Sequence, residues 1–350
     1  MVKKKLIFLA LRPFYKAIRF IANYTVNNFY YIKNCCPKFV NSKTITLLYD
    51  LRNSSFSVGD FIYFFHSKNF FNNFNKINFA IILSKNFPFI NDIRFGEELN
   101  KYNYEDKLHN ILNMHKSFGI DRKNIFLFES IDSFYKYINF TKSAIYPTNI
   151  NYGVFYSPKI INDYYDTYDF PFLKINKTTN YLKLRKKIGN NFLIVVQLRN
   201  KLHDIHRNSK IDVWIKVFKN YSRHNITFLI ISSFEEFKIL NQKIPSSINQ
   251  NIFFSKSNNL KFDINDDMAA IYDCDYYFGA NSGPGAVRYL SKKRFLIFNT
   301  FFKVDNYYKK NIFVNHNLFQ SFIFANKQQM FTSRKESFPM IIKLIDSLLE

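Results

Sequence analysis

The chain concentrates its few glycines in one loop near its C-terminal end. Only 8 of 350 residues are glycine, yet three of them fall within seven positions that begin at Gly279. The apolar stretch Tyr276–Phe278 predicts a buried strand that Gly279 ends, and Ala286–Leu290 predicts the opening of a helix. Backbone N–H groups and the dipole at such a helix start bind phosphate. The loop between them is therefore predicted to hold an anion; its residues are Asn281, Ser282, Gly283, Pro284 and Gly285.

Two further loops place polar residues directly after predicted strands. Arg199 follows one strand, and its planar guanidinium is suited to bind two phosphate oxygens at once. Ser232 and Ser233 follow the next. Because parallel strands end at one edge of their sheet, the three loops are expected to meet there around an anionic ligand. Two alternatives stay open: Arg199 forms an interdomain salt bridge, or Ser282 simply caps its helix.

Metal-binding patterns are weak in this sequence. His203 and His206 have HxxH spacing, but no glutamate accompanies them. The three cysteines, Cys35, Cys36 and Cys274, form no CxxC pair. The sequence therefore predicts neither a metal site nor a disulfide framework, and it favours a reducing cytosol.

Alternating strands and helices are predicted to position these loops. Strands are expected at Thr44–Tyr49, Asn78–Leu83, Ile125–Phe128, Ala144–Tyr146, Phe192–Gln197, Thr227–Ser232, Ile252–Phe254, Tyr276–Phe278 and Phe295–Phe298. Helices are expected at Tyr104–Phe118, Asp132–Ile138, Asp212–Tyr221, Phe234–Gln242, Asp267–Asp273, Ala286–Leu290 and Phe338–Leu349. This alternation predicts an α/β fold of two Rossmann-like domains with parallel sheets that face a cleft.

Changes in composition along the chain suggest where the domains end. We expect a basic amphipathic arm at residues 1–40, a first Rossmann-like domain at 41–155, an interdomain connection at 156–190, a second Rossmann-like domain at 191–310 and a C-terminal helical segment at 311–350.

The N-terminal arm combines basic and apolar residues. Phe14, Ile18 and Ile21 fall at helical spacing with lysine and arginine between them, so the arm is suited to an anionic membrane surface. The alternative, packing on the body of the protein, stays open. The apolar stretch Leu6–Leu11 is too short for a signal peptide core or a membrane span. We therefore expect a cytoplasmic protein that can lie on the inner face of the membrane.

The formal charge of +24, from 50 basic and 26 acidic residues, suggests an anionic partner. An AT-rich genome, which favours lysine, asparagine and phenylalanine codons, explains the same excess. The 24 tyrosines and 43 phenylalanines are also compatible with a nucleic-acid-binding protein. However, the basic residues are spread along the chain and no nucleic-acid-binding motif occurs, so this is the less favoured alternative.

Residues Asp267–Pro284 resemble the donor-binding signature of GT-B glycosyltransferases, in particular the heptosyltransferase-like and related bacterial cell-surface enzymes. In that group a helix ends in an Ala/Cys-Asp pair, a strand leads to glycine, and an Asn/Asp-Ser-Gly-Pro loop meets the diphosphate of a nucleotide sugar. Val195–Arg199 is similar to the phosphate-binding arginine segment of the fucosyltransferase-like branch. The resemblance covers roughly residues 192–300. Heptosyltransferases usually have an acidic residue where this chain has Asn281.

The resemblance implies roles for the first half of the chain as well. Gly59-Asp60 looks like the Gly-Asp loop that faces the cleft, which makes Asp60 the expected base for the acceptor hydroxyl and His66 a substitute. The alternative for Asp60 is that it caps its helix. Residues 41–155 would bind the acceptor and residues 191–310 the nucleotide sugar.

Together these features predict a glycosyltransferase that moves a sugar from a nucleotide sugar to a cell-envelope glycan or a lipid-linked acceptor. Arg199 would stabilise the leaving diphosphate in place of a metal, so we expect no cofactor. The partners are then the nucleotide sugar, the acceptor and an anionic membrane surface. A nucleic-acid-binding protein, or a scaffold that has lost catalysis, are the alternatives.

Overall fold

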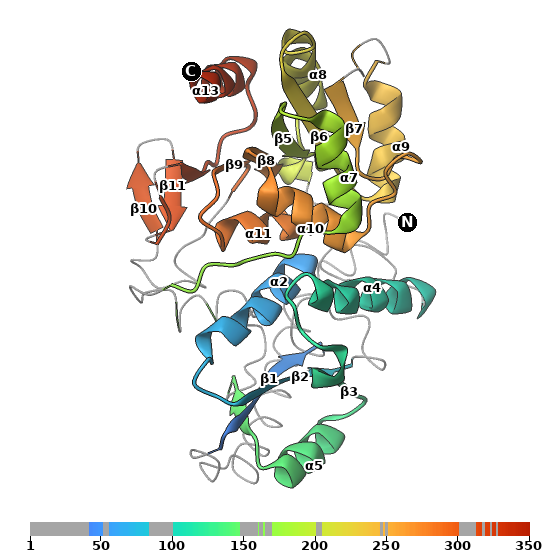
Figure 1. Cartoon of the computed structure of the whole chain (residues 1–350), viewed down its shortest axis with the longest axis vertical. Coiled ribbons are helices and arrows are strands. Elements are labelled where there is room, and N and C mark those ends of the chain that lie inside the picture. Colours follow the sequence, from blue (N-terminus) through green and yellow to red (C-terminus); the bar gives the residue numbers. More distant parts are fainter. Residues whose placement is uncertain are drawn as a thin grey trace, which may run out of the picture. The chain divides into compact units, whose positions relative to one another are not determined.

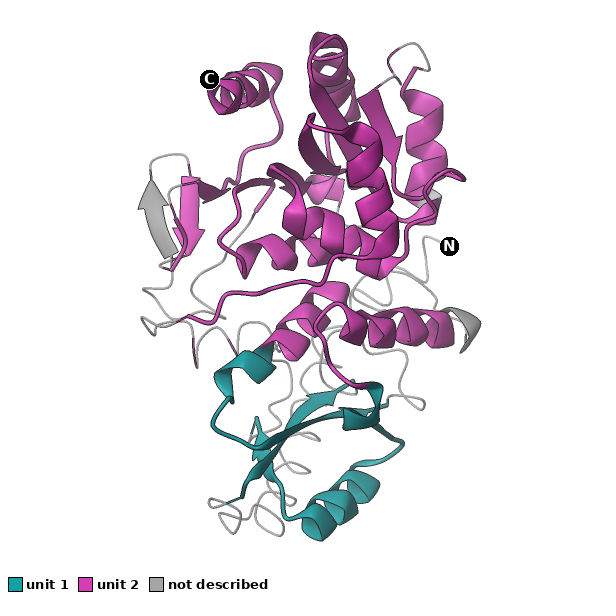
Figure 2. Cartoon of the chain, in the orientation of Figure 1, with its two compact units in different colours: residues 1–56, 67–91, 122–156 teal, residues 57–66, 92–121, 157–350 magenta. Residues whose placement is uncertain are grey.

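The computed structural model describes residues 42–51, 56–83, 101–147, 160, 164, 170–200, 205–245, 248, 251–300, 313–316, 319–322, 324–326 and 328–350. The arm predicted for residues 1–40 and His203 lie outside these residues. The chain divides into two compact units, shown in Figure 2: unit 1 comprises residues 1–56, 67–91 and 122–156, and unit 2 comprises residues 57–66, 92–121 and 157–350.

Unit 1 is built on a parallel sheet with the strand order β3-β2-β1-β4. Its strands are β1 (Thr44–Asp50), β2 (Lys76–Ile82), β3 (Ile125–Phe128) and β4 (Ala144–Tyr146). Helix α5 (Ile131–Thr141) packs Phe134 and Ile138 against Leu48 and Ile82 of the two central strands. This apolar contact fixes the register, because a shift by one residue would turn Leu48 to the other face of the sheet.

Unit 2 contains a larger sheet with the strand order β10-β11-β12-β9-β8-β5-β6-β7. Its strands are β5 (Phe192–Gln197), β6 (Ile226–Ile231), β7 (Ile252–Phe254), β8 (Tyr276–Ala280), β9 (Phe295–Phe298), β10 (Phe313–His316), β11 (Phe319–Phe322) and β12 (Gln329–Phe331). From β12 to β7 all neighbours are parallel, whereas β11 is antiparallel to both of its neighbours, β10 and β12. The chain leaves β5 towards β6 and β7 and then returns to its other side at β8.

The helices of unit 2 cover this sheet and extend beyond it (Figure 1). They are α2 (Val58–His66), α4 (Lys101–Asn113), α7 (Thr179–Ile188), α8 (Ile211–Asn220), α9 (Phe234–Lys243), α10 (Ile264–Asp273), α11 (Ala286–Tyr289) and α13 (Phe338–Leu349). Trp214 of α8 packs edge-on against Phe278 of β8, and Ile341 and Ile345 of α13 join the same buried core. The two helices are therefore held on one face of the sheet by apolar burial.

The sequence predicted both parallel sheets and most of their elements. It was wrong about the end of β8, which continues through Gly279 to Ala280. A Cβ at Gly279 would lie 2.7 Å from the hydroxyl of Tyr277, so glycine here makes room for a neighbouring ring within the strand.

The sequence also missed three strands and one helix of unit 2. Residues 311–350 were expected to be helical, but β10, β11 and β12 precede the single helix α13 in the part of that segment that the structure describes. Helix α7 lies within the stretch predicted as a connection. The buried residues of α7 are Tyr181, Leu184 and Ile188. Because this apolar stripe is narrow and the rest of the helix is rich in lysine, the helical period is weak in the sequence.

Candidate functional site

The strand order of unit 2 defines a place for a ligand. The connections that leave β5 and β8 run in opposite directions although the two strands are neighbours. Open parallel sheets bind ligands outside the carboxyl ends of their strands at such a switch point. Arg199 follows β5 and Asn281 follows β8, so the structure brings the predicted arginine and the predicted loop to the same switch point.

The backbone around Arg199 is held in place by Ser209. The Arg199 N–H donates to the Ser209 hydroxyl at 3.2 Å, and the Ser209 N–H donates to the Arg199 carbonyl at 2.9 Å. The Arg199 side chain is half-buried and lies at the edge of the sheet rather than in its core. A fixed backbone at this position lowers the entropy that a guanidinium loses when it binds a ligand.

The helix after β8 begins at Ala286 as predicted, but it is short. Gly283–Gly285 forms a 3₁₀ turn, and α11 has only four residues. Pro284 has no N–H, and the Gly285 N–H donates to the Ser282 carbonyl at 3.2 Å. The helix dipole at this loop is therefore weaker than the sequence suggested.

The side chain of Ser282 offers a different ligand group. Ser282 occupies the N-cap position of the turn but makes no capping hydrogen bond, which excludes the simple capping alternative. Its Oγ atom is buried and has no hydrogen-bond partner in the protein. A buried hydroxyl without a partner is costly, so this atom is suited to a ligand or an ordered water.

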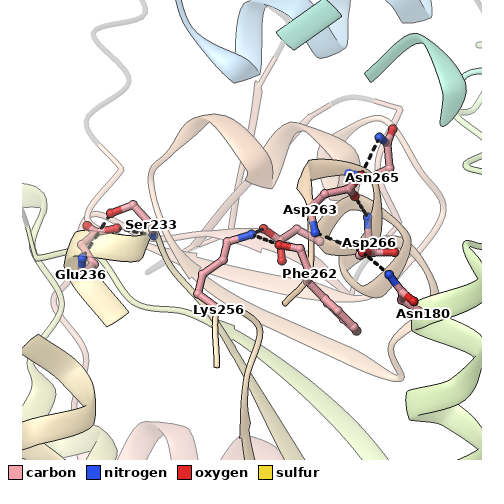
Figure 3. Close-up of polar contacts among 9 residues, drawn as sticks. Asn180, Ser233, Glu236, Lys256, Phe262, Asp263, Asn265 and Asp266 are labelled. Atoms are coloured by element: carbon pink, nitrogen blue, oxygen red, sulfur yellow. Dashed lines mark hydrogen bonds and ion pairs between the residues drawn. The ribbon is translucent and has the colours of Figure 1, made fainter. Parts of the chain in front are cut away.

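The hydroxyl groups of the two serines after β6 differ in their hydrogen bonds. The Oγ atom of Ser233 caps α9 by accepting the Glu236 N–H at 3.2 Å, whereas the Ser232 Oγ atom is buried and has no partner. The Glu236 carboxylate accepts the N–H of Ser233 at 2.9 Å (Figure 3). Its other oxygen accepts the N–H of Asn200 at 3.0 Å. Glu236 thereby ties the loop after β5 to the start of α9. The Ser-x-x-Glu spacing of a capping box was the signal in the sequence that could have identified it.

Arg207 is a second residue that the sequence did not single out. It lies in the 3₁₀ turn Ile205–Arg207, and its Nη2 atom donates to the carbonyl of Asn281. This bond joins the chain after β5 to the loop after β8, across the switch point. No local pattern predicts it, because the two residues are distant in the sequence.

Helix α2 packs directly on the loop after β8. A Cβ on Gly283 would lie 2.7 Å from the backbone nitrogen of Gly59, and a Cβ on Gly59 would lie 2.9 Å from the Cα atom of Gly283. Both residues belong to unit 2. The two backbones are therefore in contact, and both positions require glycine.

Asp60 is next to this contact. Its carboxylate accepts the Ser57 hydroxyl at 2.7 Å, and its N–H donates to the same hydroxyl at 3.2 Å. Ser57 thus begins the helix, and Asp60 takes part in the capping interaction that was considered as its alternative role. The side chain is 7% exposed.

His66 lies at the other end of α2 and is fully buried. Its Nε2 atom donates to the carbonyl of Pro171 at 2.6 Å, and its ring packs against Phe170. These contacts fasten α2 to the chain at Phe170–Pro171, and we do not assign His66 a role in chemistry.

The starts of α7 and α10 border a cavity of about 210 Å³ in unit 2. Asp263 caps α10 through the N–H groups of Asn265 and Asp266, at 2.8 and 2.9 Å. The Asp266 carboxylate accepts the amide N–H of Asn180 at 3.1 Å (Figure 3). It also accepts the hydroxyl of Thr178. The Asp266 carboxylate thus holds the starts of α7 and α10 together.

Asp267 of α10 forms an ion pair with Lys256, which precedes the helix. Its carboxylate lies 2.6 Å from the Nζ atom of Lys256, which also donates to the carbonyl of Phe262 at 2.7 Å (Figure 3). Burial raises the pKa of Asp267 to about 6, although the charge of Lys256 acts in the opposite direction.

This raised pKa predicts a measurable pH dependence. The folded state binds a proton at Asp267 that the unfolded state has released between about pH 4 and 6, so this contribution to stability is present at pH 4 and is lost as the pH rises through 6. We expect the free energy of unfolding of wild type to fall by about 2 kcal/mol relative to that of Asp267→Asn between pH 4 and pH 7. Urea unfolding of both proteins at the two pH values measures it, and the comparison cancels all other titrating groups. A difference that does not change with pH would show an ordinary pKa.

The described residues contain neither a candidate membrane span nor a candidate metal site. None of their helices is long and apolar enough to cross a membrane. No group of three or more histidine, cysteine, aspartate or glutamate side chains in this part of the chain is arranged to hold a metal ion.

Comparisons with known proteins give structural neighbours only. No protein-family model matches the sequence, and no curated protein matches it. A family 9 glycosyl transferase from Veillonella parvula is 10% identical with a TM-score of 0.48, over 87% of this chain and 97% of that one. The ADP-heptose LPS heptosyltransferase II of E. coli is 8% identical with a TM-score of 0.46, over 87% and 98%.

A putative UDP-N-acetylglucosamine 2-epimerase from Listeria monocytogenes is also similar, at 8% identity and a TM-score of 0.34, over 73% of this chain and 79% of that one. The structural neighbours thus include glycosyltransferases of the group that the sequence resembles.

Proposed function

We propose that this chain is a glycosyltransferase that moves a sugar from a nucleotide sugar to a hydroxyl group of a glycan or a lipid-linked acceptor. One observation carries the proposal. At the switch point of a parallel sheet, Arg199 lies between two strand ends that each present a buried serine hydroxyl without a partner, Ser232 and Ser282. A cation flanked by unpaired hydroxyls is suited to a diphosphate.

The proposal assigns each group a step. Arg199 and the Ser282 loop hold the diphosphate and stabilise the negative charge that develops when its bond to the sugar breaks, without a metal ion. Asp60, beside the Gly59–Gly283 contact, accepts the proton of the attacking hydroxyl. Residues 1–40 would hold the enzyme on the anionic inner face of the membrane, near a lipid-linked acceptor.

Calorimetric titration tests the donor site. Wild type, Arg199→Ala and Lys219→Ala are titrated with UDP, GDP, ADP, CDP, CMP and an RNA oligomer. Lys219 is the matched control because it is an exposed cation at the last turn of α8, away from the strand ends. We expect wild type to bind one of the nucleotides selectively, Lys219→Ala to bind it equally well, and Arg199→Ala to bind at least tenfold more weakly, which is about 1.4 kcal/mol.

Two results would contradict the proposal. Equal loss in both variants would show that general charge, and not the switch point, attracts the nucleotide. Tight RNA binding without nucleotide preference, with an affinity that falls steeply as salt is added, would instead show a nucleic-acid-binding protein.

A further inference from the structure

Asn299 directly follows β9 and combines two unfavourable features. Its backbone has φ 58°, in the left-handed region that favours glycine. Its side chain is fully buried, and neither the oxygen nor the nitrogen of its amide has a hydrogen-bond partner. Of the three non-glycine residues with positive φ in the described chain, the other two, Lys142 and Lys261, have exposed side chains.

Both features cost free energy, and glycine at this position would remove both of them. The left-handed backbone costs asparagine less than other side chains but more than glycine, and a buried amide without partners has lost its hydrogen bonds to water. Such a group in a folded protein calls for an explanation, and a bound ligand that completes its hydrogen bonds is one.

The position of Asn299 indicates which ligand. Phe298 pairs with Ala280 of β8, and the Asn281 N–H donates to the Phe298 carbonyl at 3.2 Å. Asn299 therefore lies beside the loop that carries the unpaired Ser282 hydroxyl. The backbone N–H of Asn299 donates to the Arg334 carbonyl at 3.1 Å, which fixes the backbone. The side-chain amide of Asn299 is therefore the group that is left to bind a ligand.

The hydrogen-bonding groups of the Asn299 amide indicate which part of a nucleotide sugar it can bind. The NH₂ group needs an acceptor and the carbonyl oxygen needs a donor. A phosphate that is fully ionised offers acceptors only, whereas a sugar hydroxyl both accepts and donates. The unpaired amide of Asn299 therefore fits a hydroxyl group better than it fits the diphosphate.

We propose that the Asn299 amide binds a hydroxyl group of the nucleotide sugar, on either its ribose or the sugar to be transferred. This inference rests on the proposed function and adds a residue that selects the carbohydrate part of the donor. The contact would be made on the β9 side of the switch point, next to the diphosphate.

The test uses Asn299→Gly, which removes the amide and suits the left-handed backbone, and Asn299→Asp, which keeps the size but removes the NH₂ donor. Lys142→Gly is the matched control: it changes a left-handed residue of similar φ, 49°, in unit 1. Each full-length protein is titrated with UDP, GDP, ADP and CDP, and with UDP-glucose, GDP-mannose and ADP-glucose. Thermal unfolding checks that each variant is folded.

We expect both Asn299 variants to bind at least tenfold more weakly while Lys142→Gly binds as wild type does. If the variants bind both the nucleoside diphosphate and its sugar conjugate more weakly, the contact is to the ribose. If they bind only the sugar conjugate more weakly, the contact is to the transferred sugar. Unchanged affinity of folded Asn299→Gly for every ligand that wild type binds would overturn this inference and leave the glycosyltransferase proposal standing. Absence of any nucleotide binding by wild type would overturn both.

Discussion

Gly283→Ala is expected to lower the free energy of unfolding by about 3 kcal/mol and to detach α2 from the loop after β8. The new methyl group would lie 2.7 Å from the Gly59 nitrogen and 3.4 Å from its Cα atom, so no rotation of a side chain can relieve the overlap. Either the loop or the helix must move. Because Asp60 follows Gly59, the same substitution should also displace the proposed base.

Gly285→Ala is the matched control in the same turn. Its methyl group would lie 2.7 Å from the hydroxyl at the tip of the Tyr289 ring, which can shift more easily than backbone. Urea unfolding compares the two variants, and amide hydrogen exchange of residues 58–66 reports on α2. We expect faster exchange in α2 for Gly283→Ala and a smaller change for Gly285→Ala. Equal exchange in both variants would show that the Gly59–Gly283 contact does not hold the helix.

Two substitutions of Arg288 are expected to change the free energy of unfolding in opposite directions. The side chain is fully buried, and its Nη2 atom donates to the carbonyl of Cys274 at 2.7 Å and contacts the Cys274 sulfur. Its Nε and Nη1 atoms have no partner. Burial raises the pKa of the Cys274 thiol, so the thiol stays neutral at pH 7 and does not balance the charge.

Arg288→Met keeps most of the volume and removes the buried charge, so we expect the free energy of unfolding to rise by about 1–3 kcal/mol. Arg288→Ala removes the packing as well and should lower it by about 3 kcal/mol. Denaturant unfolding of both variants and wild type measures the difference. A loss of stability of similar size in Arg288→Met would mean that the hydrogen bonds to Cys274 outweigh the cost of burying the guanidinium.

Local patterns in the sequence were sufficient to predict most of the regular elements. The apolar stretches that became β5, β6 and β9 were predicted within one residue, because a strand buried on both faces is apolar at consecutive positions. Elements whose signal is weaker were missed, such as α7 with its narrow stripe and β10–β12, where three short strands pair antiparallel.

An α/β chain with parallel sheets and polar loops after β5, β6 and β8 could be predicted from the amino-acid sequence. These properties follow from residue type and period, which act within a few positions. Folding in three dimensions is needed to bring Gly59 against Gly283, to place Arg207 at the Asn281 carbonyl, and to bury the Asn299 amide without a partner. Each of these depends on which strand neighbours which and on how closely two backbones pack, and packing between distant segments leaves no periodic signal in either segment.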